Sequence, residues 1–144
     1  MNIKVKKLDP RAIIPTCGSE YSAGYDLYAC LEEPVEIKPG ETKLIGTGLC
    51  MELPVGYFGA IFARSGLALK QGIRPANCVG VCDCDYRGEY KAPLHNDSSE
   101  TRVISHGDRI AQMVILPYQS LTFEECSELG ETGRGEGGFG STGK

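Results

Sequence analysis

The fold class is decided by residues 49–62, which read Leu-Cys-Met-Glu-Leu-Pro-Val-Gly-Tyr-Phe-Gly-Ala-Ile-Phe. Apolar residues alternate with Cys50 and Glu52 in the first part, which is the period of a strand with one buried face. Residues 54–56 have turn composition, and the aromatic and apolar run over 57–62 is typical of a more deeply buried strand. The sequence therefore predicts two strands joined by a short turn.

The same pattern extends to both sides of this stretch. Further strands are predicted at residues 3–6, 35–38, 79–85 and 110–116, each bounded by turn-forming residues. Only residues 65–71 have a helical pattern, with Ser65 as the candidate N-cap and Gly72 at the end. Many short strands and one helix of about two turns predict an all-β barrel or sandwich.

The composition narrows the class of protein. A chain of 144 residues, 41% of them hydrophobic, can build one domain around one core. Its net charge of −4 argues against a nucleic-acid partner, because duplex binding needs a basic face. No apolar run approaches the ~20 residues that span a bilayer, and the N-terminal residues lack the apolar stretch of a signal peptide. We therefore expect a soluble cytoplasmic protein with neither a nucleic-acid nor a membrane partner.

Seven cysteines raise the question of disulfides or zinc. An odd number in a chain of this size argues against a disulfide framework. The cluster of Cys78, Cys82 and Cys84 has no second pair of ligands, and the two histidines stand alone, so the pattern does not favour structural zinc. We expect these cysteines to be small hydrophobic residues of the core in a reducing compartment.

The segment from Gly130 differs from the rest, because it contains seven glycines and one aromatic residue, Phe139. Such a segment cannot bury enough apolar surface to offset its ordering entropy, so we expect it to be mobile. It is either a plain disordered terminus or a lid that orders over a ligand. Residues 138–144 match the first part of a P-loop but lack its preceding strand and following helix, so they are not a Walker motif.

Three places carry candidate chemistry, each with a plainer alternative. Arg64, Ser65 and Gly66 open the predicted helix, where they bind an anion or form an ordinary cap with a surface arginine. In a strand over 79–85, Asp83 and Asp85 share one face. The functional alternative is that one of these carboxylates activates a water molecule, and the plainer one is that both aspartates belong to a turn.

Gln112 is the third such place, as the only polar side chain of the predicted strand over 110–116. A buried amide needs hydrogen-bond partners. Its partner is either the backbone or a ligand phosphate.

Five segments together resemble the motifs of the trimeric dUTPase family, in the same order and at similar separations. They are residues 23–29, 64–67, 77–88, 107–112 and 134–143. The resemblance covers almost the entire chain. It implies a distorted jelly-roll subunit, with residues 1–129 as the core and residues 130–144 as a mobile lid. It also implies a homotrimer whose active sites lie at subunit interfaces.

The family resemblance implies hydrolysis of dUTP to dUMP and pyrophosphate by attack of water on the α-phosphate. This reaction limits uracil in DNA and supplies dUMP for thymidylate synthesis. Mg²⁺ would be held mainly by the triphosphate, with Asp26 reaching it through water. Asp83 resembles the residue that orients and deprotonates the water, and Tyr86 the residue under the deoxyribose.

The remaining roles also follow from the resemblance. Residues 77–91 would form a β-hairpin that holds uracil through backbone groups and Asn77. Arg134 would reach the γ-phosphate and Phe139 would stack on uracil. The expected substrate-binding residues are Arg64, Ser65, Gly66, Asn77, Val81, Cys82, Asp83, Tyr86, Lys91, Gln112, Arg134, Phe139 and Gly140.

The chain departs from the family pattern at a few positions. Ala63 stands where proline is usual, Cys82 where isoleucine is usual, and Cys84 replaces a small residue between the aspartates. The alternatives are a dCTP deaminase of related fold, a non-catalytic nucleotide-binding regulator and a β-sandwich binding module without nucleotide chemistry. Tyr86 and the short chain favour the dUTPase.

Overall fold

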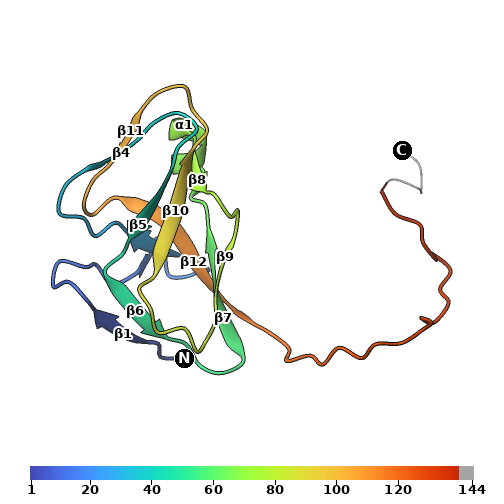
Figure 1. The fold of residues 1–144 in the computed structure, drawn as a ribbon. Coiled ribbons are helices and arrows are strands. Elements are labelled where there is room, and N and C mark those ends of the chain that lie inside the picture. Colours follow the sequence, from blue (N-terminus) through green and yellow to red (C-terminus); the bar gives the residue numbers. More distant parts are fainter. Residues whose placement is uncertain (140–144) are drawn as a thin grey trace.

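The computed structural model describes residues 1–139, which hold twelve strands and one helix (Figure 1). In chain order they are β1 (Lys4–Lys7), β2 (Thr16–Cys17), β3 (Tyr25–Tyr28), β4 (Val35–Ile37), β5 (Thr42–Gly46), β6 (Leu49–Glu52), β7 (Tyr57–Phe62), α1 (Ser65–Gln71), β8 (Ile73–Pro75), β9 (Gly80–Cys82), β10 (Lys91–Asn96), β11 (Arg102–Ile104) and β12 (Arg109–Pro117). The prediction of an all-β fold with a single short helix is confirmed. No helix within residues 1–139 is long and apolar enough to cross a membrane.

The strands form four antiparallel sheets arranged as a distorted jelly roll. The largest has the order β2-β3-β12-β7-β9, the next β5-β10-β8, and two further pairs are β1-β6 and β4-β11. β12 lies between β3 and β7, because its apolar run buries Ile110, Ala111 and Met113. It therefore joins the segments on both sides of the sequence into one sheet.

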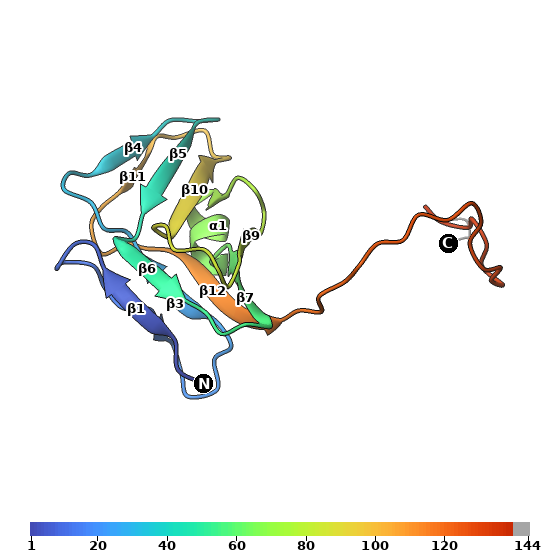
Figure 2. The same cartoon turned by 60° about the horizontal axis from the view of Figure 1, so that its bottom comes forward.

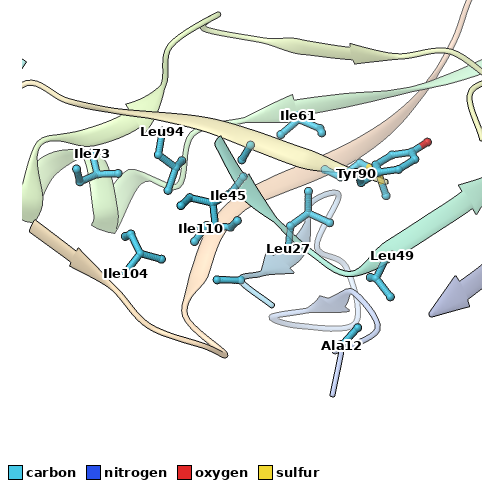
Figure 3. Close-up of a cluster of buried hydrophobic side chains, with 14 of the residues drawn as sticks. Ala12, Leu27, Ile45, Leu49, Ile61, Ile73, Tyr90, Leu94, Ile104 and Ile110 are labelled. Atoms are coloured by element: carbon cyan, nitrogen blue, oxygen red, sulfur yellow. The ribbon is translucent and has the colours of Figure 1, made fainter. Parts of the chain in front are cut away.

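A single apolar cluster fills the space between the sheets (Figure 3). Leu27, Ile45, Leu94 and Ile110 come from four different strands and are at most 1% exposed. Each fully buried side chain of this size stabilises the fold by about 1.5–3 kcal/mol relative to exposure. The cluster therefore fixes the strands whose ends carry the polar residues described below.

The helix ends as predicted but begins differently. Gly72 has a left-handed φ of 66°, and its N–H donates to the Ala68 carbonyl at 3.0 Å, which closes the helix. The N-cap is Arg64, with extended backbone and no side-chain cap. The prediction of Ser65 as N-cap is therefore wrong, because Ser65 is already the first helical residue.

The strand predicted over residues 79–85 is shorter than expected. β9 ends at Cys82, and the Tyr86 N–H donates to the Asp83 carbonyl at 3.2 Å, so Asp83 to Tyr86 form a turn. The prediction that Asp83 and Asp85 share a strand face is wrong, since aspartate favours turns over strands.

The pairing of β9 also corrects the expected hairpin. β9 pairs with β7, whereas β10 pairs with β5 and β8. Residues 77–91 are therefore not a hairpin of their own. They form the connection between β8 and β10, and β9 within this connection extends the large sheet.

All seven thiols are free, but they are not core residues. Cys17, Cys78 and Cys126 are exposed, and the other four are half-buried. Of these, Cys30 and Cys82 pack against the core. The prediction of small core hydrophobes is wrong because several of the cysteines lie in loops, where the strand period provides no buried face.

Residues 118–139 contain no helix or strand and run away from the body of the molecule (Figures 1 and 2). Leu121, Phe123 and Leu129 on this arm are 72%, 93% and 87% exposed. Apolar side chains at such exposure are available to another surface. The division of the chain between residues 129 and 130 stays a prediction.

Candidate functional site

A cavity of about 330 Å³ opens beside β9 and β10. We call it the β9 pocket. Six of the residues that sequence analysis assigns to substrate line it, namely Asn77, Val81, Cys82, Asp83, Tyr86 and Lys91. They meet there because β9 and the turn after it face the start of β10.

A second cavity of about 370 Å³ lies where α1 begins beside β12. We call it the arginine pocket. Its lining includes the four expected phosphate contacts, Arg64, Ser65, Gly66 and Gln112, together with Asp26 and Arg109. The two pockets share no lining residue. Within one chain, the expected base and phosphate contacts are therefore divided between two cavities.

Asp26 organises the arginine pocket. Its Oδ1 accepts from Arg64 Nε at 2.7 Å, and its Oδ2 accepts from Arg109 Nη1 at 3.3 Å. The Asp26 side chain is 14% exposed, so solvent screens these ion pairs less than ordinary surface pairs. The carboxylate orients both guanidinium groups along one wall of the cavity.

The number of carboxylates in the arginine pocket determines how the protein could bind Mg²⁺. Among residues 1–139, Asp26 is the only acidic residue that lines the arginine pocket. Within residues 1–139 no group of three His, Cys, Asp or Glu side chains could hold a metal ion. Mg²⁺ usually keeps several waters and binds through one or two carboxylates plus substrate phosphates. The residues therefore fit an ion that a triphosphate brings, not a cage made by the protein alone.

Gln112 uses its amide within the fold as well as in the pocket. Its Nε2 donates to the Ala63 carbonyl at 2.8 Å, so the backbone alternative from sequence analysis is confirmed as a contact. A Cβ at Gly24 would lie 2.5 Å from Gln112 Oε1. A side chain at position 24 would displace this oxygen from its observed position, which accounts for a glycine just before β3.

Tyr86 stands on the wall of the β9 pocket. Its hydroxyl donates to the Glu89 carbonyl at 3.0 Å, and its ring centroid lies 5.9 Å from that of Tyr90 with an interplanar angle of 54°. Asp83 lies at the start of the same turn and makes no ion pair among the described residues. Its carboxylate is thus free to accept a proton or orient a water.

The thiol next to Asp83 has a different character. Burial, with a smaller contribution from the Asp83 charge, raises the pKa of Cys82 to about 11. The group is therefore a neutral thiol at neutral pH. Cys84 on the other side contacts Tyr118 Oη at 3.5 Å, at the beginning of the arm.

Arg134 and Phe139, the two expected tail contacts that the structure describes, do not reach the pockets of their own chain. Arg134 Nε donates to the Gly137 carbonyl at 2.6 Å, and Phe139 is exposed with a φ of 51°. Neither residue lines the β9 pocket or the arginine pocket. Gly140 lies outside the described residues.

Two residues of the site escaped sequence analysis. Arg109 joins Asp26 across 83 positions of sequence, and Tyr90 lies beneath Tyr86. One feature of the sequence pointed to an arginine partner such as Arg109: Asp26 lies in a half-buried strand, where a carboxylate needs a cation. No comparable signal marked Tyr90, which follows a turn as an ordinary apolar residue.

The sequence and the fold both match known dUTPases. The dUTPase family model matches residues 10–143. The deoxyuridine 5'-triphosphate nucleotidohydrolase of Nautilia profundicola is 51% identical over 144 residues, covering 100% of both chains. The protein of the same name from Syntrophotalea carbinolica is 47% identical, covering 99% of this chain and 97% of its own.

Solved structures agree. A Staphylococcus bacteriophage 80alpha dUTPase G164S mutant with dUpNHpp superposes with a TM-score of 0.86 at 27% identity, covering 99% of each chain. A dUTPase from phage phi11 of S. aureus, described with a structural Mg(II) ion, has a TM-score of 0.82 at 24% identity, with 91% of this chain and 100% of that chain covered. With pockets that collect residues from four of the five motifs, a family model spanning nearly the whole chain and full-length relatives near 50% identity, the chain belongs to the dUTPase family.

Proposed function

We propose that the protein hydrolyses dUTP to dUMP and pyrophosphate by attack of water on the α-phosphate. One observation carries the proposal: a pocket suited to a base and sugar and a pocket suited to phosphates occur on the same fold. The reaction would limit uracil in DNA and supply dUMP for thymidylate synthesis. Family membership and the names of the full-length relatives support this activity.

Asp83 is the proposed general base. It opens the turn directly after β9, lines the β9 pocket and has no ion-pair partner among residues 1–139, so its carboxylate is available to water. A water that loses a proton to this carboxylate can attack the phosphorus directly. No covalent intermediate with the protein is needed. Asn77, Val81, Cys82 and Lys91 would hold the base and sugar beside Tyr86.

The arginine pocket is the proposed phosphate site. Arg64, Ser65, Gly66 and Gln112 offer charged, hydroxyl and amide donors to phosphate oxygens. Mg²⁺, when bound to the triphosphate, supplies charge neutralisation at the reacting phosphates. Asp26 would orient that ion through water while keeping Arg64 and Arg109 in place.

The proposed assembly is a homotrimer with active sites between subunits. A division of the two pockets within one chain supports this, because different copies can bring them together. β1 pairs only with β6 among the described strands, so its other edge is open to a neighbour. The exposed arm offers the apolar side chains Leu121 and Phe123 for contact with another subunit.

Residues 130–144 are the proposed lid. Arg134 would bind the γ-phosphate and Phe139 would stack on the base. Closure would exclude water and fix the α-phosphate for attack. We also place the protein in the cytoplasm, where a reducing environment suits seven free thiols.

A pyrophosphate-release assay tests the activity. The purified protein is given dUTP and each of the four common deoxynucleotides, with ammonia release from dCTP measured in parallel. We expect magnesium-dependent pyrophosphate release from dUTP alone. Ammonia from dCTP would instead indicate a deaminase. Tight dUTP binding without any product would indicate a non-catalytic regulator.

A further inference from the structure

We infer that Tyr90 is a positioning residue whose ring braces Tyr86 and thereby sets how strongly the enzyme rejects ribonucleotides. The inference rests on the proposed function, in which Tyr86 packs against the sugar. Tyr90 belongs to the wall of the β9 pocket but is only 1% exposed, so we place its effect in the support of Tyr86 and not in a substrate contact of its own. Tyr90 is held rigidly in the core, whereas Tyr86 stands in an exposed turn.

Tyr90 is anchored in the core through both its ring and its backbone. It is 1% exposed and the largest of the fully buried side chains (Figure 3). Its N–H donates to the Leu49 carbonyl at 2.8 Å. Its own carbonyl accepts from the Thr47 N–H at 3.1 Å and from the Thr47 hydroxyl at 2.7 Å. The ring therefore has a fixed place at one end of the core.

Tyr86 has no such anchorage of its own. It is 45% exposed, and it belongs to the turn after β9. Its ring is held by the hydroxyl bond to Glu89, by the tilted contact with Tyr90 and by a close approach to Gly88. A Cβ at Gly88 would lie 2.6 Å from Tyr86 Cζ, so glycine is required beneath the ring.

Rejection of a 2′-hydroxyl depends on how hard this ring is to move. A ribonucleotide can fit only if Tyr86 gives way, so the cost of displacing Tyr86 limits its binding. A ring-to-ring contact at this distance and tilt is within the favourable range for aromatic pairs. Removing the Tyr90 ring removes one of the contacts that resist displacement. Loss of the Tyr90 ring should therefore raise kcat/KM for UTP relative to kcat/KM for dUTP.

The ring of Tyr90, and not its hydroxyl, performs this role. The hydroxyl has no hydrogen-bond partner among the described residues. In Figure 3 it points away from the labelled core side chains. Tyr90→Phe keeps the ring and removes only this unpaired group, whereas Tyr90→Leu removes the ring. The two substitutions therefore separate bracing from the chemistry of the hydroxyl.

The test measures kcat/KM for dUTP and UTP in the full-length wild type, Tyr90→Phe, Tyr90→Leu and Ile37→Ala. Ile37 is 0% exposed and lines neither pocket, so Ile37→Ala controls for loss of core packing. We expect the dUTP-to-UTP ratio to fall roughly twofold to tenfold in Tyr90→Leu, the range that an aromatic pair contributes beyond burial. The ratio should be unchanged in Ile37→Ala and retained in Tyr90→Phe.

Each outcome decides between bracing and another role. A wild-type ratio in Tyr90→Leu, or an equal fall in Ile37→Ala, overturns the inference. A ratio that falls as far in Tyr90→Phe as in Tyr90→Leu also overturns it, because the hydroxyl would then be responsible. Tyr90→Met carries the same test if the leucine variant does not fold. Absence of pyrophosphate release by the wild type would defeat the proposed function instead.

Discussion

Asp83 provides the sharpest test at the scale of single residues. Asp83→Asn keeps the shape of the side chain and removes the proton acceptor, so kcat for dUTP should fall by about 10²–10⁴. Asp85→Asn is the matched control, since Asp85 lies in the same turn but does not line the β9 pocket. Steady-state pyrophosphate release measures both, and calorimetry with a non-hydrolysable analogue should find binding intact. A near-normal kcat in Asp83→Asn would remove this residue from the mechanism.

Cys82 allows a test of the buried wall of the same pocket. Its pKa is raised from 9.0 to about 11 by burial, and the thiolate is the reactive form. Allowing for the greater nucleophilicity of a more basic thiolate, alkylation near pH 8 should be roughly tenfold or more slower than at exposed Cys17 and Cys126. The rate at Cys82 should keep rising as the pH approaches 11. Mass-spectrometric footprinting with iodoacetamide checks this, and equal rates at all three thiols would contradict the burial.

The arrangement of β3, β12 and the loop before α1 can be tested at the scale of elements. In Gly24→Ala the new methyl group would collide with Gln112 Oε1 and push the amide from the Ala63 carbonyl. Overpacking of this kind should lower the free energy of unfolding by about 1–3 kcal/mol and raise KM for dUTP. Urea unfolding and steady-state kinetics measure the two effects.

Gly18→Ala is the matched control for this change. Gly18 lines the same pocket, but a Cβ there meets only Ser22 Oγ, at an ordinary 3.8 Å. Its free energy of unfolding should stay within about 0.5 kcal/mol of the wild type. Equal losses in Gly18→Ala and Gly24→Ala would mean that Gln112 is not held as described.

Pattern reasoning works best for elements whose side chains alone define them. β7 has its predicted bounds, because an uninterrupted apolar run begins after Gly56. β10 was missed because it contains Pro93, His95 and Asn96, which are poor strand formers, and it depends on pairing with β5 and β8. Pairing with strands distant in the sequence determines whether such a segment forms a strand, and the local residue pattern does not show that pairing.

The candidate site was predictable to a similar extent. Motif resemblance named six residues that line the β9 pocket and five that line the arginine pocket, but it gave no role to Arg109 or Tyr90, whose roles depend on distant partners. Arg109 matters because of Asp26 on another strand, and Tyr90 because of the turn that places Tyr86 over it. The shortening of β9 followed from the turn preference of the two aspartates, which competes with the strand pattern.

The proposed role of residues 130–144 as a lid belongs to the scale of the whole molecule, because the described part of the tail, residues 130–139, does not line the pockets of its own chain. Truncation after Leu129 removes Arg134 and Phe139 but nothing that lines either pocket. The truncated protein should stay folded and trimeric by light scattering, with kcat for dUTP largely lost. Phe139→Ala should be intermediate, with kcat/KM reduced roughly fivefold to a hundredfold for a stacking contact of ~1–3 kcal/mol. Full kcat after truncation would make the tail an ordinary terminus.

Two cavities that share no lining residue also make the protein open to genetic complementation. Asp83→Asn damages only the β9 pocket, and Arg64→Ala damages only the arginine pocket. If neighbouring subunits join these pockets, two inactive proteins refolded together in equal amounts should regain activity at about a quarter of their sites by random mixing. If each chain completes its own site, the mixture should remain inactive. Two defective alleles in one cell would therefore restore each other's activity only if neighbouring subunits of the oligomer join their pockets into one site.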